Sequence, residues 1–299
     1  MPNDSKQGLL FIHALTALHP GSGSALGVVD LPVQRERHTQ WPIIPGSAVK
    51  GVLRDAATRA TAKKDEKLLT AFGPDTSDAD AYAGAISLTD ARLIAFPVRS
   101  LKGVFAWVTC PAALQRLSRD LKLAGLQSSI KVQSPDAKKA ITSHKSPLTL
   151  DDGNQKKLIL EEFDFTVESQ TDDTVAKWIS ENAISDKDTS ERIMSHLVIL
   201  NDDDFGHFVK HATEVVARIK LDYATKTVKD GALFYEEFLP TDCIFYSVAF
   251  ANPSRSGGVK MNATETYSFL SGVVNSRAYL QFGADETIGK GICAVKMTN

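Results

Sequence analysis

The chain has 299 residues, of which 43% are hydrophobic and 23% are charged, and its formal net charge is −2. This composition is typical of a soluble globular protein, and the near-neutral charge argues against non-specific adhesion to nucleic acid. A local basic patch could still bind phosphate. The three cysteines form no CxxC pair, no apolar run reaches membrane-spanning length and no cleavable signal opens the chain, so we expect a cytoplasmic protein without membrane contact.

The N-terminal segment contains a glycine-serine turn between two predicted elements. A strand is predicted over 9–18, and it leads into the turn at 19–27. A short apolar run then ends at Asp30, whose carboxylate is expected to lie at the end of an apolar strand. Prolines keep the next residues out of a helix until Ser47, which is placed to cap a helix that runs to about residue 62.

The rest of the chain mixes strand and helix patterns without a regular βα repeat. Strands are predicted at 84–91, 105–109, 158–167, 243–250, 278–282 and 292–296, and helices from Pro111 onward and at 171–183, 189–198, 203–216 and 265–275. This order favours an α+β fold over a doubly wound sheet. We treat residues 1–299 as a single domain with insertions.

Two segments differ from these regular elements. Residues 127–157 are rich in lysine, serine and aspartate, which favours a flexible, solvated insertion over a recognition surface. Between 218 and 240, two strand-like runs flank a polar tip at 225–231, a pattern that predicts a β-hairpin.

Two separate segments have the residue types that bind a phosphate chain. The helix start at Ser47 offers unpaired backbone N–H groups, and Lys50 and Arg54 add positive charge to one helix face. The second segment is the glycine-rich loop at 283–291, where Lys290 stands between Gly289 and Gly291. Taken alone, this loop is more often a plain hairpin turn, and it lacks the spacing of a Walker loop. Together the two segments predict a clamp on one polyanion.

Asp30 and His19 are the candidate catalytic residues. The Asp30 carboxylate could accept a proton from a ribose 2′-hydroxyl, orient that hydroxyl or hold a hydrated divalent ion. From the residues alone, an Asp30 that caps a turn is favoured over a catalytic one. His19 opens the glycine turn, and a turn-stabilising imidazole is as well supported as a catalytic imidazole.

The histidines show no established zinc-binding spacing. His207 and His211 lie four residues apart on a predicted helix, which is a spacing that two metal ligands can use. No glutamate base lies between them, so a surface or capping role is favoured over zinc.

Several of these segments resemble the RAMP superfamily, and in particular the repeated backbone subunits (fourth subunit, Cas7 group) of the type III-B CRISPR effector, the Cmr complex. The resemblance rests on His-Pro-Gly-Ser-Gly-Ser at 19–24, Val-Asp-Leu-Pro at 29–32, Gln-Arg-Glu at 34–36, Ile-Pro-Gly-Ser at 44–47, Lys-Gly-Val-Leu-Arg at 50–54, Leu-Phe-Tyr-Glu-Glu-Phe-Leu-Pro at 233–240 and Asp-Glu-Thr-Ile-Gly-Lys-Gly at 285–291. Because these segments lie at both ends and in the late middle, the resemblance extends over nearly the whole chain.

The resemblance implies a fold, an activity and partners. The fold is an RRM-like (ferredoxin-like) palm with an inserted helical or finger region and a β-hairpin thumb, for which residues 218–240 are the candidate. The activity is metal-dependent (Mg²⁺ or Mn²⁺) endonucleolytic cleavage of target RNA paired with the guide RNA (crRNA), at six-nucleotide intervals. The partners are crRNA, target RNA, further copies of the chain in a helical filament and other Cmr subunits.

The resemblance also implies roles for particular residues. Asp30 matches the catalytic aspartate and the residue nearest the metal, and His19 matches a second candidate catalytic residue. The guide backbone is expected to contact Ser47, Lys50, Arg54, Gly289, Lys290 and Gly291.

Three other interpretations compete with RNA-guided cleavage. The chain could be a structural subunit that binds crRNA without cutting, or an endoribonuclease of the same superfamily that processes precursor RNA at a metal-independent, histidine-centred site. It could also be a glycine-rich α+β protein unrelated to RNA.

Overall fold

The computed structural model describes residues 4–25, 27–60, 65–75, 81–171, 173–255 and 259–298. Its strands are β1 (Lys6–Ala14), β2 (Ile43–Ile44), β3 (Ile86–Leu88), β4 (Ala91–Arg99), β5 (Phe105–Thr109), β6 (Lys139–Ser143), β7 (Leu150–Asp151), β8 (Lys156–Leu160), β9 (Phe163–Thr171), β10 (Leu197–Ile199), β11 (Glu214–Leu221), β12 (Val228–Phe238), β13 (Ile244–Ala251), β14 (Tyr279–Gln281) and β15 (Ile292–Thr298). Its helices are α1 (Gly46–Ala60), α2 (Glu66–Phe72), α3 (Pro111–Leu123), α4 (Thr174–Ala183), α5 (Lys187–His196), α6 (Asp202–His211) and α7 (Ala263–Asn275), with a short 3₁₀ helix η2 (Glu286–Ile288). None of these helices is long and apolar enough to cross a lipid bilayer.

One large mixed sheet organises the chain. Its strands follow the order β14-β15-β1-β13-β4-β5-β10-β6-β9-β8-β7, while β2 pairs with β4 and β3 pairs with β13. Within it, β15-β1-β13-β4 form an antiparallel group. With α1 between β1 and β4, and α7 between β13 and β15, this group has the βαββαβ connectivity of a ferredoxin-like fold. The predicted α+β class is confirmed.

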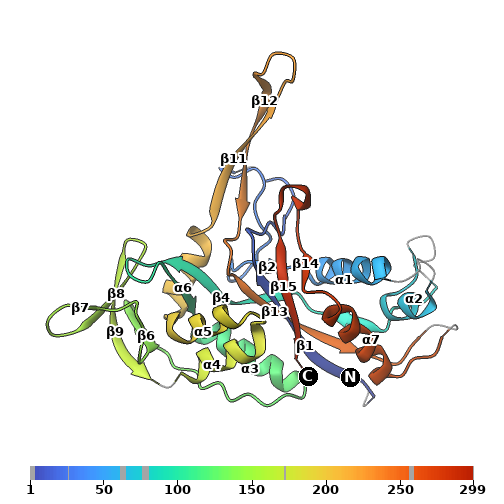
Figure 1. Cartoon of the computed structure of the whole chain (residues 1–299), viewed down its shortest axis with the longest axis horizontal. Helices are drawn as coiled ribbons and strands as arrows, with labels where there is room; N and C mark the ends of the chain where they lie inside the picture. Colours follow the sequence, from blue (N-terminus) through green and yellow to red (C-terminus); the bar gives the residue numbers. More distant parts are fainter. Residues whose placement is uncertain are drawn as a thin grey trace.

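Helices cover both faces of the sheet. This explains why the sequence of the central strand β1 is continuously apolar. Successive strand side chains point to opposite faces. Leu10 and Ile12 therefore belong to the core layer beneath α1, α2, α6 and α7, whereas Leu9 and Phe11 belong to the layer beneath α3, α4 and α5. Figure 1 shows the helices on either side of the strands.

The segment between β4 and β13 is a long insertion that carries α3–α6 and β5–β12. Its last part is the β11–β12 hairpin, which pairs separately from the large sheet and projects from the body of the molecule (Figure 1). The predicted hairpin at 218–240 is therefore present, and it begins earlier, at Glu214. Its assignment as the thumb stays a prediction.

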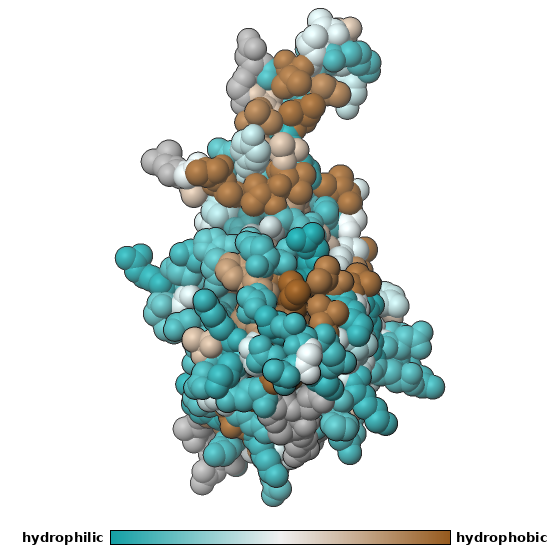
Figure 2. Space-filling model, turned by 90° about the vertical axis from the view of Figure 1, so that its left-hand side faces the viewer, coloured by the Kyte–Doolittle hydropathy of each residue, from teal (hydrophilic) through white to brown (hydrophobic). Residues whose placement is uncertain are grey.

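The projecting hairpin exposes large apolar side chains. They are Val215 (50% exposed), Ile219 (53%), Leu221 (46%), Val228 (46%) and Leu233 (55%). Figure 2 shows hydrophobic surface, in brown, along the hairpin above a mainly hydrophilic body. A two-stranded hairpin that stands apart from the rest of the protein is stabilised by few contacts. In a single copy of the chain, its apolar side chains therefore stay exposed to water.

The segment at 127–157 has more regular structure than its composition predicts. It contains β6, which lies inside the large sheet between β10 and β9, with Ala140 fully buried. Leu148 is also fully buried. Few apolar residues are enough here because β6 is paired along both edges and its faces pack into the two core layers, Ala140 in one and Ile141 in the other. Flexibility of the remaining residues stays a prediction.

Several element boundaries differ from the predictions, and one strand was not predicted. The first strand ends at Ala14 instead of residue 18, and the helix predicted at 203–216 ends at His211. Val215 and Val216, which favour strands, belong to β11 instead. The strand at 91–99 was not predicted because Pro97 interrupts its pattern, yet Pro97 pairs with Trp107 in the sheet.

Candidate functional site

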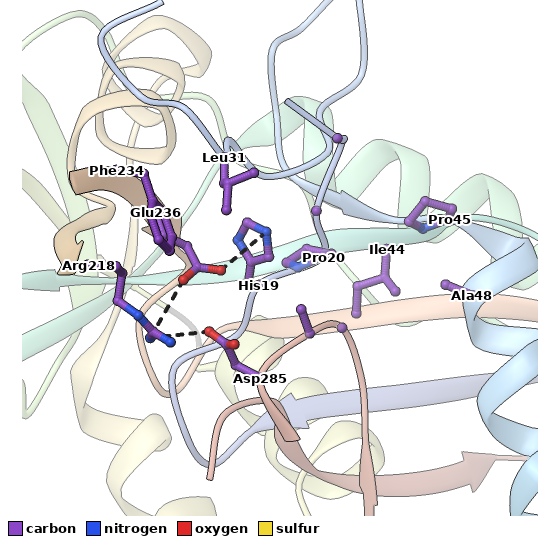
Figure 3. Close-up of a pocket in the computed structure, with 14 residues that line it drawn as sticks. His19, Pro20, Leu31, Ile44, Pro45, Ala48, Arg218, Phe234, Glu236 and Asp285 are labelled. Carbon is purple, nitrogen blue, oxygen red and sulfur yellow. Dashed lines mark hydrogen bonds and ion pairs between the residues drawn. The ribbon is translucent and has the colours of Figure 1, made fainter. Parts of the chain in front are cut away.

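A surface cavity of about 630 Å³ lies where the base of the hairpin meets three other segments. These are the turn that begins at His19, the start of α1 and the loop before β15. The cavity is lined by His19, Leu31, Pro45, Arg218, Glu236 and Asp285, among others (Figure 3). The predicted turn, helix start and glycine-rich loop therefore share one cavity, although they lie far apart in the sequence.

His19 is held in a fixed orientation at this cavity. Its side chain is buried, with the whole residue 4% exposed, and its Nδ1 lies 2.6 Å from the carbonyl oxygen of Glu237. Because a carbonyl can only accept, Nδ1 donates the hydrogen bond and Nε2 is left facing the Glu236 carboxylate at 3.7 Å. The imidazole also packs against the Phe238 ring.

Beside His19, one arginine lies between two carboxylates that the sequence analysis did not single out. Arg218 is 3.6 Å from Glu236 and 3.4 Å from Asp285 (Figure 3). Burial raises the pKa of Glu236, and the negative charge of Asp285 raises it further, against the opposing effect of His19 and Arg218. Glu236 and Asp285 belong to the segments 233–240 and 285–291 that carried the resemblance, but no role was predicted for either carboxylate.

Asp30 is half-exposed and is hydrogen bonded to the hairpin. Its backbone N–H and that of Leu31 donate to the carbonyl oxygen of Tyr235 at 3.1 and 3.0 Å. In return, the Tyr235 N–H donates to Asp30 Oδ2 at 2.7 Å. The prediction of an apolar strand before Asp30 is wrong, because the neighbouring Val28 is 92% exposed and lies in a loop. The hairpin, rather than a strand end, fixes the carboxylate.

The start of α1 differs from the prediction in its cap. The helix begins at Gly46, whose N–H donates to Asp90 Oδ1 at 2.7 Å, and Ser47 is exposed in the first turn. Ser47 is therefore not the cap. Partial burial lowers the pKa of Lys50, and the nearby Arg54 charge lowers it further.

The Arg54 guanidinium is already paired within the chain. It donates to Asp75 Oδ1 at 2.8 Å and to the carbonyl oxygen of Pro74. Arg54 would have to exchange these partners before contacting a phosphate.

The glycine-rich loop is bonded to the His19 turn. The Ala284 N–H donates to the His19 carbonyl oxygen at 3.0 Å, and the Gly291 N–H donates to that of Ala17 at 2.9 Å. The Lys290 ammonium lies 4.7 Å from the centre of the Phe238 ring, which also contacts His19. The two segments of the predicted clamp, this loop and the start of α1, both line the cavity, and their joint binding of a polyanion stays a prediction.

Gly289 and Gly291 form a matched pair for testing how tightly this loop is closed. Both have positive φ angles, 77° and 72°, but a Cβ on Gly291 would lie 1.9 Å from the Phe282 carbonyl oxygen, whereas nothing lies within 4 Å of one on Gly289. We expect Gly289→Ala to cost about 1–2 kcal/mol of unfolding free energy, and Gly291→Ala to cost clearly more because the backbone must also move. Urea unfolding of both variants measures the difference. Equal losses would contradict the tight closure.

The described residues contain no group of three or more histidine, cysteine, aspartate or glutamate side chains that could hold a metal ion. Asp30 nevertheless fits one kind of divalent site. Its carboxylate is half-exposed, and only its Oδ2 has a hydrogen bond to a described residue. Mg²⁺ is commonly held by one or two carboxylates, with water and substrate phosphate as the other ligands.

Comparisons with known proteins agree over nearly the full length. A model of the RAMP superfamily matches residues 11–294. The CRISPR system Cmr endoribonuclease Cmr4 of Pyrococcus furiosus is 41% identical over 299 residues, which cover 98% of this chain and 96% of that protein.

Two solved structures have a similar fold. The crystal structure of oligomeric Cmr4 from Pyrococcus furiosus superposes with a TM-score of 0.75 at 35% identity and covers 98% of each chain. A chain in the cryo-electron microscopy structure of type III-B Cmr-beta in its apo state superposes with a TM-score of 0.73 at 25% identity, again covering 98% of each chain.

Proposed function

Because this chain belongs to the RAMP superfamily, we propose that it is the repeated backbone subunit of a type III-B CRISPR effector that binds crRNA and cuts complementary target RNA. Its similarity to a Cmr endoribonuclease and to a chain of Cmr-beta supports this function. The observation that carries it here is the half-exposed Asp30 carboxylate, fixed at the base of a projecting hairpin. The partners are crRNA, target RNA, further copies of this chain and other Cmr subunits, and the location is the cytoplasm.

Guide RNA is expected to bind through its backbone. Phosphate contacts do not depend on sequence, and target sequence is read by base pairing, as a guide-tolerant subunit requires. Lys50 and Lys290 supply such contacts, together with the exposed Ser47. Gly289 and Gly291 contribute by letting the RNA backbone approach closely, since their N–H groups already donate to the carbonyl oxygens of Glu286 and Ala17. Arg54 makes a smaller contribution because Asp75 competes for its guanidinium.

The hairpin is the proposed source of the six-nucleotide cutting interval. Its exposed apolar side chains, such as Ile219 and Leu233, suit insertion into a stacked duplex better than contact with water. A wedge of this kind leaves a target nucleotide unpaired beside the base of the hairpin. Since Tyr235 of β12 is bonded to Asp30, each wedge carries one carboxylate with it, and repeated copies cut at regular intervals.

Asp30 is the proposed catalytic residue for strand cleavage. It orients the ribose 2′-hydroxyl and accepts its proton while the 2′-oxygen bonds to phosphorus and the bond from phosphorus to the 5′-oxygen breaks. The products are a 2′,3′-cyclic phosphate and a 5′-hydroxyl. An unpaired nucleotide reaches the in-line geometry more easily than a rigid A-form duplex. Mg²⁺ or Mn²⁺ bound beside Asp30 would supply positive charge to the phosphate.

His19 is the candidate proton donor to the leaving 5′-oxygen. Its fixed Nδ1 bond leaves Nε2 toward the cavity and Glu236. Because His19 is buried, RNA reaches its imidazole less easily than it reaches the Asp30 carboxylate. A role in positioning other groups is therefore the competing assignment for His19.

Cleavage mapping with the assembled complex tests the proposed function. The chain, crRNA and the other Cmr subunits are incubated with end-labelled complementary RNA, with Mg²⁺ or with chelator. We expect products spaced by six nucleotides with Mg²⁺ and none with chelator. Target that is bound but uncut would favour the non-catalytic structural subunit. Cutting of precursor RNA in chelator would favour the processing endoribonuclease.

A further inference from the structure

A second hollow, separate from the cavity at His19, lies at the C-terminal end of α6. Its volume is about 290 Å³, and its lining includes Glu161, Glu162, Phe163, His207 and His211. The two histidines are four residues apart on α6, so their side chains lie on the same helix face, and both are exposed. The proposed function uses neither of them.

The spacing of the two rings matches that of two ligands on one metal ion. Their centroids are 4.8 Å apart and the ring planes are inclined by 44°. An ion bound at about 2.1 Å from one nitrogen of each ring lies about 3.2 Å from each centroid. Centroids 4.8 Å apart then subtend about 100° at the ion, which lies between the octahedral and tetrahedral angles.

The imidazole nitrogens are available for such an ion. Neither His207 nor His211 donates or accepts a hydrogen bond within the part of the chain that the structure describes. A capping role is therefore absent, because the helix end is closed by the Ala212 N–H, which donates to the Phe208 carbonyl oxygen.

A neighbouring aromatic ring also helps to hold one of the two imidazoles in place. Phe163 packs edge-on against His207 with centroids 5.0 Å apart, which restricts that ring.

We propose that His207 and His211 form a two-imidazole site for a divalent late first-row transition ion, such as Zn²⁺, Ni²⁺ or Cu²⁺. Imidazole suits these ions better than Mg²⁺ or Mn²⁺, so the site differs in ligand chemistry from the one at Asp30. No third histidine, cysteine, aspartate or glutamate completes a cluster among the described residues. Water fills the remaining positions, and Glu161 and Glu162 line the same hollow and add negative charge.

Binding of the purified full-length chain to Zn²⁺ alone tests the site by calorimetry without RNA or partner subunits. Mutating a residue that only supports a metal ligand typically lowers metal affinity 10–100-fold. We therefore expect His207→Ala and His211→Ala each to weaken Zn²⁺ binding at least about tenfold. The control is His38→Ala, which removes an imidazole with 73% exposed side chain elsewhere on the chain and should leave binding unchanged.

Circular dichroism of the variants establishes that each is folded, and the conservative His211→Gln variant replaces His211→Ala if it is not. Equal Zn²⁺ affinity in wild type and in the double variant His207→Ala/His211→Ala would overturn the site, as would absence of binding to the wild type. RNA cleavage is not part of this readout, so failure of the site and failure of the proposed function are separate results.

Discussion

Replacing Asp30 with asparagine is expected to slow target-RNA cleavage by at least about a hundredfold, which is the lower part of the range for loss of a general base. The amide oxygen of asparagine can still accept the Tyr235 N–H bond that Asp30 Oδ2 accepts at 2.7 Å. The loop therefore stays attached to β12 while the negative charge and the proton acceptor are lost. Gel-resolved cleavage rates of the assembled complex measure the effect.

Two further variants separate chemistry from anchoring. Asp203→Asn removes an exposed carboxylate on α6 and should leave the cleavage rate unchanged. Asp30→Ala removes both the charge and the bond to Tyr235, so it should also loosen the loop. Wild-type cleavage by an Asp30→Asn complex that assembles normally would contradict the catalytic assignment and leave the non-catalytic subunit as the better interpretation.

The candidate site was predictable from sequence where a local pattern carried the signal. The glycine-serine turn and the loop at 283–291 could each be recognised from the sequence alone, but the hydrogen bonds that join them could not, because the two segments lie at opposite ends of the chain. The cluster of Arg218, Glu236 and Asp285 could not be recognised in this way. Each is an ordinary charged residue in its own segment, and only the packing of the hairpin base against the last loop makes them neighbours.

The same distinction applies to the fold. Elements with a clear hydrophobic period were predicted best: α3 begins at Pro111 as expected, and α7 was predicted close to its observed bounds. The strand β6 was missed because its burial comes from sheet neighbours distant in sequence, namely β9 and β10. The early start of β11 was missed because the polar end of α6 runs into it without a glycine or proline to mark the boundary.

A buried ion pair between Arg35 and Glu237 is expected to have the largest effect on stability. Their side chains are only 14% and 8% exposed, and the guanidinium of Arg35 contacts Glu237 Oε1 at 2.5 Å. The other oxygen, Oε2, accepts the Val33 N–H at 3.0 Å, and Arg35 also donates to the Val209 carbonyl oxygen. The pair thus joins the loop that follows Asp30 to the base of β12 and the end of α6.

Replacing Arg35 with methionine should lower the free energy of unfolding by about 3–5 kcal/mol, because it leaves the Glu237 carboxylate buried without its cation. The double variant Arg35→Met/Glu237→Met removes the stranded charge as well and should recover part of the loss. Urea unfolding measures both. The matched control is Lys187→Met, which breaks an exposed pair with Glu191, of 85% and 70% side-chain exposure, and should change little.

The order of these stabilities decides what the ion pair does. If Arg35→Met is no less stable than Lys187→Met, the contact with Glu237 contributes nothing beyond a surface pair. If Arg35→Met is destabilised and Arg35→Met/Glu237→Met regains stability, the unpaired charge of the Glu237 carboxylate is the cause. The Asp30 loop and the hairpin base are then held together by the pairing of Arg35 with Glu237, in addition to the backbone bonds with Tyr235. Cleavage should consequently fall in Arg35→Met even at temperatures where the chain remains folded, since the loop that contains Asp30 loses one of its attachments to the hairpin.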